Sequence, residues 1–407
     1  MLGVGTYALT IPPPEDSIGN ERFGDADDNI NGDLDVSGTL TIVGRGADLT
    51  SITTNRADRI LEALPDSSVM LSKLGVKNGY TPHGGGGLWV NAGAALAVQL
   101  SSLNDNLSAA AFTTCRGGAI YNAGTLTVVS TRFERNRTSD GEGPFGGGGA
   151  IYNIGSLTVR ESSFIANQAT NDDDAGLGGA IFSSGNADIR RSSFERNHVY
   201  YNGAGAAILN SGNGTLLLDN STVTSSPDFS DGYEPGVAAV ENGSKFERRF
   251  PVAPVQIARI VNSTIAGNEI RGLMNRGDIT VINSIIAGNG YPGSEEFGEP
   301  AQHDNCFTTG VNSRFIQRGL LRGTDTGHCP TTLLVLNADT FRTVLWPLAA
   351  NNNEFLPTFA LRKVSIAIDA AVGNCATQDQ RGSERPRDGN GDGIAACDIG
   401  AYERPRP

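Results

Sequence analysis

Three side chains in one region of the sequence are of the types that acid–base chemistry requires. Asp172 and Asp174 lie two positions apart, and His198 follows further along the chain. On an extended chain, side chains two positions apart point to the same face, so these two carboxylates converge. A carboxylate pair can share acid–base work at a glycosidic bond, and a histidine can take up a proton near neutral pH. Solvated loop charges that do no chemistry are the alternative, and it stays open.

Aromatic rings and one cation accompany these acids between the apolar segments. They are Phe145, Tyr200, Tyr201, Tyr233 and Arg249. Ring faces can pack on the apolar faces of a ligand, while charged groups bond its hydroxyls. We therefore predict that these five residues bind a substrate of carbohydrate type; a set of solvated loops that vary freely is the alternative, and it stays open.

A second group of oxygen-bearing side chains could hold a metal ion. Asp388, Asn390 and Asp392 alternate with glycines, as acids do at the first positions of a calcium loop, and Asp398 follows. The position at which a calcium loop carries its last acid is Ile399. Two interpretations remain, a calcium site made by Asp388, Asn390, Asp392 and Asp398, or a turn-rich loop held by a disulfide.

Composition and charge exclude several classes of protein. The chain has 31 Lys and Arg against 44 Asp and Glu, which gives a net charge of −13 without any basic run. Such a chain is a poor ligand for nucleic acid. No apolar stretch reaches the roughly 18 residues of a membrane-spanning helix. The 53 glycines follow no three-residue period, so the chain is not collagen-like.

The five cysteines predict two local disulfides. Four of them lie in the C-terminal quarter as the pairs Cys306/Cys329 and Cys375/Cys397, and none has the CxxC spacing of a zinc site. Disulfides indicate an oxidising compartment. Cys115 remains and is expected to be a buried thiol.

A repeat dominates the middle of the chain. Its clearest copies read IYNAGTLTVVSTRFERN at 120–136, IYNIGSLTVRESSFIAN at 151–167 and IFSSGNADIRRSSFERN at 181–197. Aligned, the copies give an apolar column and, three positions later, an asparagine column. The apolar column includes Phe133, Phe164 and Phe194, and the asparagine column includes Asn106, Asn136, Asn167, Asn197, Asn268 and Asn289.

Equivalent positions form columns if each copy is one coil of a solenoid. Coils then stack about 4.8 Å apart, the spacing of strands in a sheet. Inward apolar residues stack as a core, and asparagines at a turn bond one another as a ladder that satisfies buried amides. Extra residues follow the asparagine column at 137–148, 168–179, 198–206 and 227–250. We expect these inserts to leave from one corner of successive coils.

Several motifs resemble one family. Two copies open with IYN directly after GGA, which gives GGAIYN at 117–122 and 148–153. GTYALTI stands at 5–11, WPLAANNNEFLPTFAL at 346–361 and ACDIGAYE at 396–403. These motifs resemble bacterial right-handed parallel β-helix repeat proteins of the surface-associated choice-of-anchor or CSLREA-like type, which share the pectate-lyase-like superfold. The resemblance implies an all-β parallel β-helix and an extracellular or cell-surface location. It also implies a signal and an anchor that this chain does not contain. The motifs are specific for the fold and unspecific for function.

The sequence thus predicts β-helix coils over 1–290 with stacked inserts, and over 291–407 the last coils with a disulfide-stapled C-terminal cap. The favoured function is a non-catalytic secreted or surface protein that presents loops to a glycan or another surface partner. One alternative is a polysaccharide lyase or glycoside hydrolase acting on an acidic or neutral polysaccharide through Asp172, Asp174 and His198. The other is a structural extracellular filament or coat element. Ca²⁺ is the one candidate cofactor.

Overall fold

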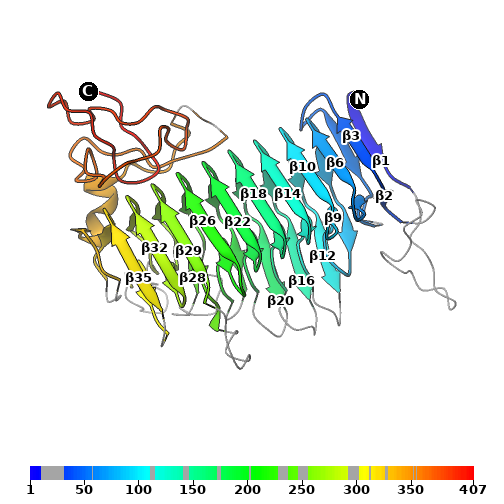
Figure 1. Ribbon diagram of the computed structural model, residues 1–407, viewed down its shortest axis with the longest axis horizontal. Coiled ribbons are helices and arrows are strands. Elements are labelled where there is room, and N and C mark those ends of the chain that lie inside the picture. The colour runs from blue at the N-terminus through cyan, green and yellow to red at the C-terminus, as the bar shows by residue number, and fades with distance from the viewer. Residues whose placement is uncertain are drawn as a thin grey trace, which may run out of the picture. The chain divides into compact units, whose positions relative to one another are not determined.

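Short parallel strands make up almost all the regular structure of this computed structural model (Figure 1). The described residues are 1–10, 32–56, 58–110, 115–140, 146–171, 176–200, 203–227, 237–245, 255–291, 302–310, 313–325, 329–351, 353 and 355–407. The chain divides into a first unit, Met1–Ala187 with Asn197–Ile208, and a second unit, Asp188–Arg196 with Leu209–Pro407. Both consist of coils of a right-handed parallel β-helix, so the predicted fold class is confirmed.

The first unit contains four parallel sheets. One contains β1 (Gly5–Ala8), β4 (Thr50–Thr53), β7 (Gly75–Lys77), β11 (Ser102–Asn104), β15 (Arg132–Glu134) and β19 (Ser163–Ile165). The next contains β3 (Thr39–Val43), β6 (Ser68–Ser72), β10 (Ala95–Gln99), β14 (Thr125–Val129) and β18 (Ser156–Arg160). The third contains β2 (Leu34–Val36), β5 (Leu61–Ala63), β9 (Leu88–Val90), β13 (Ile120–Asn122), β17 (Ile151–Asn153) and β21 (Ile181–Ser183). The fourth, called the short sheet below, contains β8 (Tyr80–Thr81), β12 (Leu107–Ala110), β16 (Arg137–Asp140), β20 (Gln168–Asn171) and β24 (His198–Val199).

The second unit repeats three of these sheets. One contains β23 (Ser193–Glu195), β27 (Thr222–Thr224), β30 (Thr264–Ala266), β33 (Ile285–Ala287), β36 (Leu321–Gly323) and β37 (Leu333–Val335). Another contains β26 (Thr215–Asp219), β29 (Ile257–Val261), β32 (Asp278–Ile282) and β35 (Arg314–Arg318). The third contains β28 (Ala238–Asn242), β31 (Arg271–Asn275) and β34 (Cys306–Thr308). The division between the units runs through β22 (Asn186–Arg190) and β25 (Ile208–Asn210).

The apolar column forms a core because the register places equivalent residues side by side. Phe133 pairs with Phe164 across β15 and β19, and both side chains are fully buried. Their rings are stacked with centroids 4.7 Å apart and planes 5° apart. The predicted stack is therefore confirmed for this pair, and Phe194 is fully buried in the second unit.

The asparagine column forms the predicted ladder in each unit. In the first unit, the Nδ2 group of Asn106 donates to Asn136 Oδ1 at 2.9 Å, Asn136 donates to Asn167 at 3.0 Å, and Asn167 donates to Asn197 at 3.0 Å. All four side chains are fully buried. The ladder of the second unit runs from Asn268 through Asn289 and Asn305 to Asn337, so it continues beyond the copies that the sequence pattern revealed.

Both predicted disulfides are present. The Cα atoms of Cys306 and Cys329 are 5.8 Å apart, and those of Cys375 and Cys397 are 6.4 Å apart. Cys115 takes part in neither disulfide and is fully buried, as expected.

The chain loses its regular strands after β37. A 3₁₀ turn, η2 (Asn337–Asp339), and a π-helical turn, η3 (Thr340–Val344), come next. Among the described residues beyond them, strand pairing is limited to isolated antiparallel bridges such as Leu345 with Leu361. In the described part of the chain, no helix has the length and apolar character needed to cross a bilayer. The boundary at 290/291 stays a prediction.

Candidate functional site

The short sheet arises where the sequence predicted loop inserts. The first residues of three inserts form strands β16, β20 and β24, and β12 precedes them in the same sheet. The register aligns Leu107 with Arg137, Arg137 with Gln168, and Gln168 with His198. Parallel strands in register end at a common edge, so the inserts of these coils start side by side.

Alternate residues of the short sheet point inward and outward. Thr138, Ala169 and Val199 are buried, whereas Arg137 is exposed and His198 is partly exposed. His198 and Tyr200 make an edge-to-face ring contact with centroids 5.4 Å apart. The structure thus brings together two of the residues that the sequence singled out.

An open cleft of about 280 Å³ lies where the short sheet begins. Four stretches of chain line it: Arg56, Asp105–Leu107, Arg135–Arg137 and Ala166 with Gln168. Figure 1 shows β12, β16 and β20, which carry part of this lining, side by side. Arg137 and Gln168 line the cleft and share the outward column of the short sheet with His198. The cleft and the predicted residues therefore lie on one face of the first unit.

The cleft carries more positive than negative charge. Arg135 bonds Asp105, with Nε 2.9 Å from Oδ1, and it also bonds Glu134. The bond to Asp105 is the main reason why the pKa of Arg135 is raised above its ordinary value. Within the described chain, the side chains of Arg56 and Arg137 make no ion pair and no hydrogen bond. Two guanidinium groups thus remain for a ligand.

The other predicted acids and rings fall outside the described residues. Asp172, Asp174, Phe145, Tyr201, Tyr233 and Arg249 belong to this group. Their approach to His198 and Tyr200 stays a prediction.

The predicted calcium loop uses its oxygen atoms within its own turns. Asp388 accepts hydrogen bonds from the backbone N–H groups of Gly391 and Gly393 at 2.7 and 3.0 Å. Asp392 accepts one from Ile394 at 2.8 Å, and Asn390 Oδ1 accepts one from Asp392 at 2.8 Å. Such bonds are typical of Asx turns, which favours the turn interpretation.

Asp398 accepts its hydrogen bonds from residues outside these turns. It is fully buried and accepts bonds from the backbone N–H groups of Asp369 and Arg404 at 2.7 and 2.6 Å. A calcium site formed by Asp398 with the three loop residues stays a prediction.

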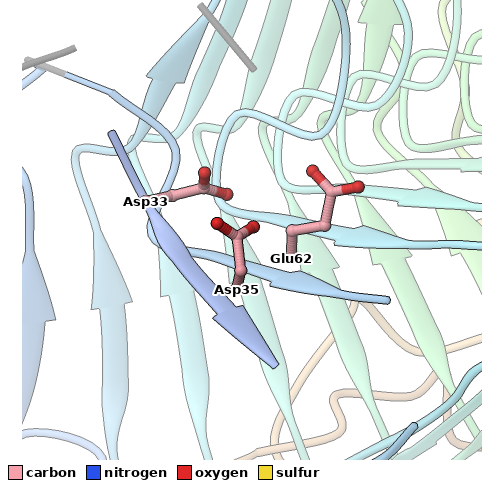
Figure 2. Close-up of side chains that lie close together, drawn as sticks. All are labelled: Asp33, Asp35 and Glu62. Carbon is pink, nitrogen blue, oxygen red and sulfur yellow. The ribbon is translucent and has the colours of Figure 1, made fainter. Parts of the chain in front are cut away.

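A different acidic group, Asp33, Asp35 and Glu62, could hold a metal ion by its geometry (Figure 2). Each residue offers an oxygen within 4.8 Å of the others, and no other described group of three or more acidic, His or Cys side chains does so. However, the buried guanidinium of Arg59 lies 3.3 Å from Asp33 and 2.6 Å from Glu62. Since Arg59 already supplies positive charge, we interpret the group as a buried ion-pair network.

Sequence reasoning missed both this group and an aromatic column beside it. Trp89, Tyr121, Tyr152 and Phe182 stack in turn, with centroids 4.0, 5.7 and 4.5 Å apart. The rings stack on one another, so the column stabilises the sheet. The repeated second position of the copies LWV, IYN, IYN and IFS was the signal that could have revealed it. Burial raises the pKa of Tyr152.

The C-terminal segment contains a buried charged cluster. Glu403 accepts hydrogen bonds from the backbone N–H groups of Arg387 and Asp398 at 2.8 and 3.0 Å, and its carboxylate lies 3.6 Å from Arg385 Nε. Arg385 and Glu403 side chains are both fully buried. Burial raises the pKa of Asp398 to about 6 and that of Glu403 to about 7.

The raised pKa values of Asp398 and Glu403 predict that the stability of the C-terminal segment depends on pH. The folded chain binds their protons more tightly than the unfolded chain does, so the protons stabilise the fold. The free energy of unfolding should therefore fall by roughly 1 to 3 kcal/mol as the pH rises from about 4 through about 7. Hydrogen exchange over 365–404, corrected for intrinsic rates, should show less protection at pH 8 than at pH 5.

The control is Glu403→Gln, which removes one of the two titrating groups and should flatten the pH dependence. Greater protection at pH 8 in the unmodified chain would contradict the expected sign.

Comparison of the chain with protein-family models, with curated proteins and with solved structures finds no match.

Proposed function

We propose that this protein is a secreted or cell-surface binding protein that holds a glycan on the outer face of the short sheet. The observation that carries the proposal is the shared column of Arg137, Gln168 and His198, which joins the cleft to the predicted ring of Tyr200. The inserts, with the predicted residues Asp172, Asp174, Phe145 and Tyr201, would extend this surface.

Three features support this proposal. A parallel β-helix is a rigid scaffold, and binding residues concentrate on loops that such scaffolds carry. The cleft combines charged, amide and apolar side chains, which suits hydroxyl-rich ligands with apolar ring faces. The two disulfides fit an oxidising compartment, in line with the resemblance to choice-of-anchor surface proteins.

Tyr200→Ala tests the proposal. The change removes a ring from the outer face, and we expect glycan affinity to fall roughly tenfold, the equivalent of about 1.4 kcal/mol. A glycan array followed by titration of the best ligand measures the effect.

Tyr7→Ala is the matched control, because Tyr7 is an exposed tyrosine of the first unit that lies on β1 in another sheet, whereas Tyr200 is partly exposed. Equal affinity of the Tyr200→Ala variant and the unmodified chain would rule out the role given to this face.

A further inference from the structure

We propose that the cleft recognises negatively charged groups, carboxylate or sulfate, spaced along a glycan chain. The inference rests on the proposed glycan-binding function and names the chemical class of ligand for the same face. The residues that carry it are Arg56 and Arg137.

These two guanidinium groups line a cleft in which arginines outnumber acids. The chain has a net charge of −13, yet the charged side chains that line the cleft are three arginines and one aspartate. Arg135 is engaged by Asp105 and Glu134, whereas Arg56 and Arg137 are exposed and bond no side chain within the described chain. The cleft therefore presents net positive charge on an acidic molecule.

Guanidinium chemistry fits oxyanions. Its planar set of N–H donors bonds two oxygens of a carboxylate or sulfate at once, and these charge-assisted bonds are stronger than neutral ones. A concave wall focuses the local field. Acids elsewhere on the surface weigh little, because physiological salt screens charges beyond about 8 Å.

The spacing of the two arginines points to a polymer rather than a single small anion. Register pairs Thr53 with Lys77, Lys77 with Asn104, and Asn104 with Glu134. Arg56 follows Thr53, the first member of this series, by three residues, and Arg137 follows Glu134, the last member, by three residues. The coils that carry them therefore lie three coil steps apart, about 14 Å at the usual strand spacing, although the lateral register does not extend to Arg56, whose N–H donates to Asn78 O while the N–H of Tyr80 donates to Asp58 O. Two anionic groups on one extended chain can meet both, and the intervening cleft is lined by Asp105–Leu107.

The test is retention of the full chain on three polymers: polygalacturonate, which carries carboxylates, dextran sulfate, and neutral dextran. The variants are Arg56→Gln, Arg137→Gln and the double change. Each single change should weaken binding of an acidic polymer roughly threefold and the double change roughly tenfold. Binding of the unmodified chain should also weaken as salt is raised.

Arg318→Gln is the matched control. Arg318 is likewise an exposed arginine without a side-chain partner in the described chain, but it lies on β35 of the second unit. Its substitution should leave retention unchanged. An equal loss in Arg318→Gln would overturn the site, because the attraction would then be general.

The remaining outcomes separate this inference from the proposed function. If the unmodified chain retains an acidic polymer and the double variant does not, the cleft is the anion-binding site. The acidic polymer that binds more tightly then shows whether carboxylate or sulfate is the group recognised. Neutral glycans bound as tightly as acidic ones, with no effect of the arginine changes, would overturn the anion site and leave glycan binding intact. No retention of any glycan across a broad array would overturn both.

Discussion

Replacing Asn136 with alanine should lower the free energy of unfolding of the first unit by roughly 3 to 5 kcal/mol. The Asn136 side chain is fully buried, accepts bonds from the backbone and side-chain amides of Asn106, and donates to Asn167 and to the backbone oxygen of Leu103. Alanine would leave these partners unsatisfied away from water, and each such group costs roughly 1 to 3 kcal/mol. Urea unfolding, combined with hydrogen exchange in neighbouring coils, measures the loss.

Asn213→Ala is the control for this experiment, since Asn213 is exposed in a turn. It should change stability by less than about 0.5 kcal/mol. If Asn136→Ala proved as mild as Asn213→Ala, the ladder would not stabilise the coils.

Replacing Phe133 with alanine should cost roughly 3 to 5 kcal/mol. Its ring is fully buried and stacked on Phe164, so the change removes apolar contacts and leaves a cavity between coils that close-packed neighbours cannot fill. Stacking adds roughly 0.5 to 1.5 kcal/mol beyond the buried area. Equilibrium unfolding followed by Trp89 fluorescence reports on this unit, because the Trp89 ring stacks on Tyr121.

Phe133→Leu provides the comparison, because it keeps much of the buried volume and should cost under about 1.5 kcal/mol. Equal losses for leucine and alanine would show that cavity formation is not the cause. A negligible loss for both would contradict the placement of Phe133 in the core.

Inward-facing features could be predicted from the sequence because each depends on a column of like residues. The register from Phe133 to Phe164 and the bonds from Asn106 through Asn197 follow from a repeat in which equivalent positions stack. The disulfides could also be predicted from the sequence, because each joins cysteines that are close along the chain.

Outward-facing features could not be predicted in the same way. The strands β16, β20 and β24 form in segments that looked like loops, because their pairing depends on neighbouring coils and not on local strand propensity. The contact of Arg59 with Asp33 and Glu62, and the cleft that joins Arg56 to Arg137, also bring together residues from different coils.

The sequence by itself determined that this chain stacks coils around an apolar and asparagine-lined interior, since burial forces a repeated residue type at each inward position. Only the tertiary structure decided which outward residues share a face. Most solvent-facing positions tolerate many residue types, and positions 137, 168 and 198 hold arginine, glutamine and histidine, so no repeated residue type marks them and the register brings Arg137, Gln168 and His198 into line.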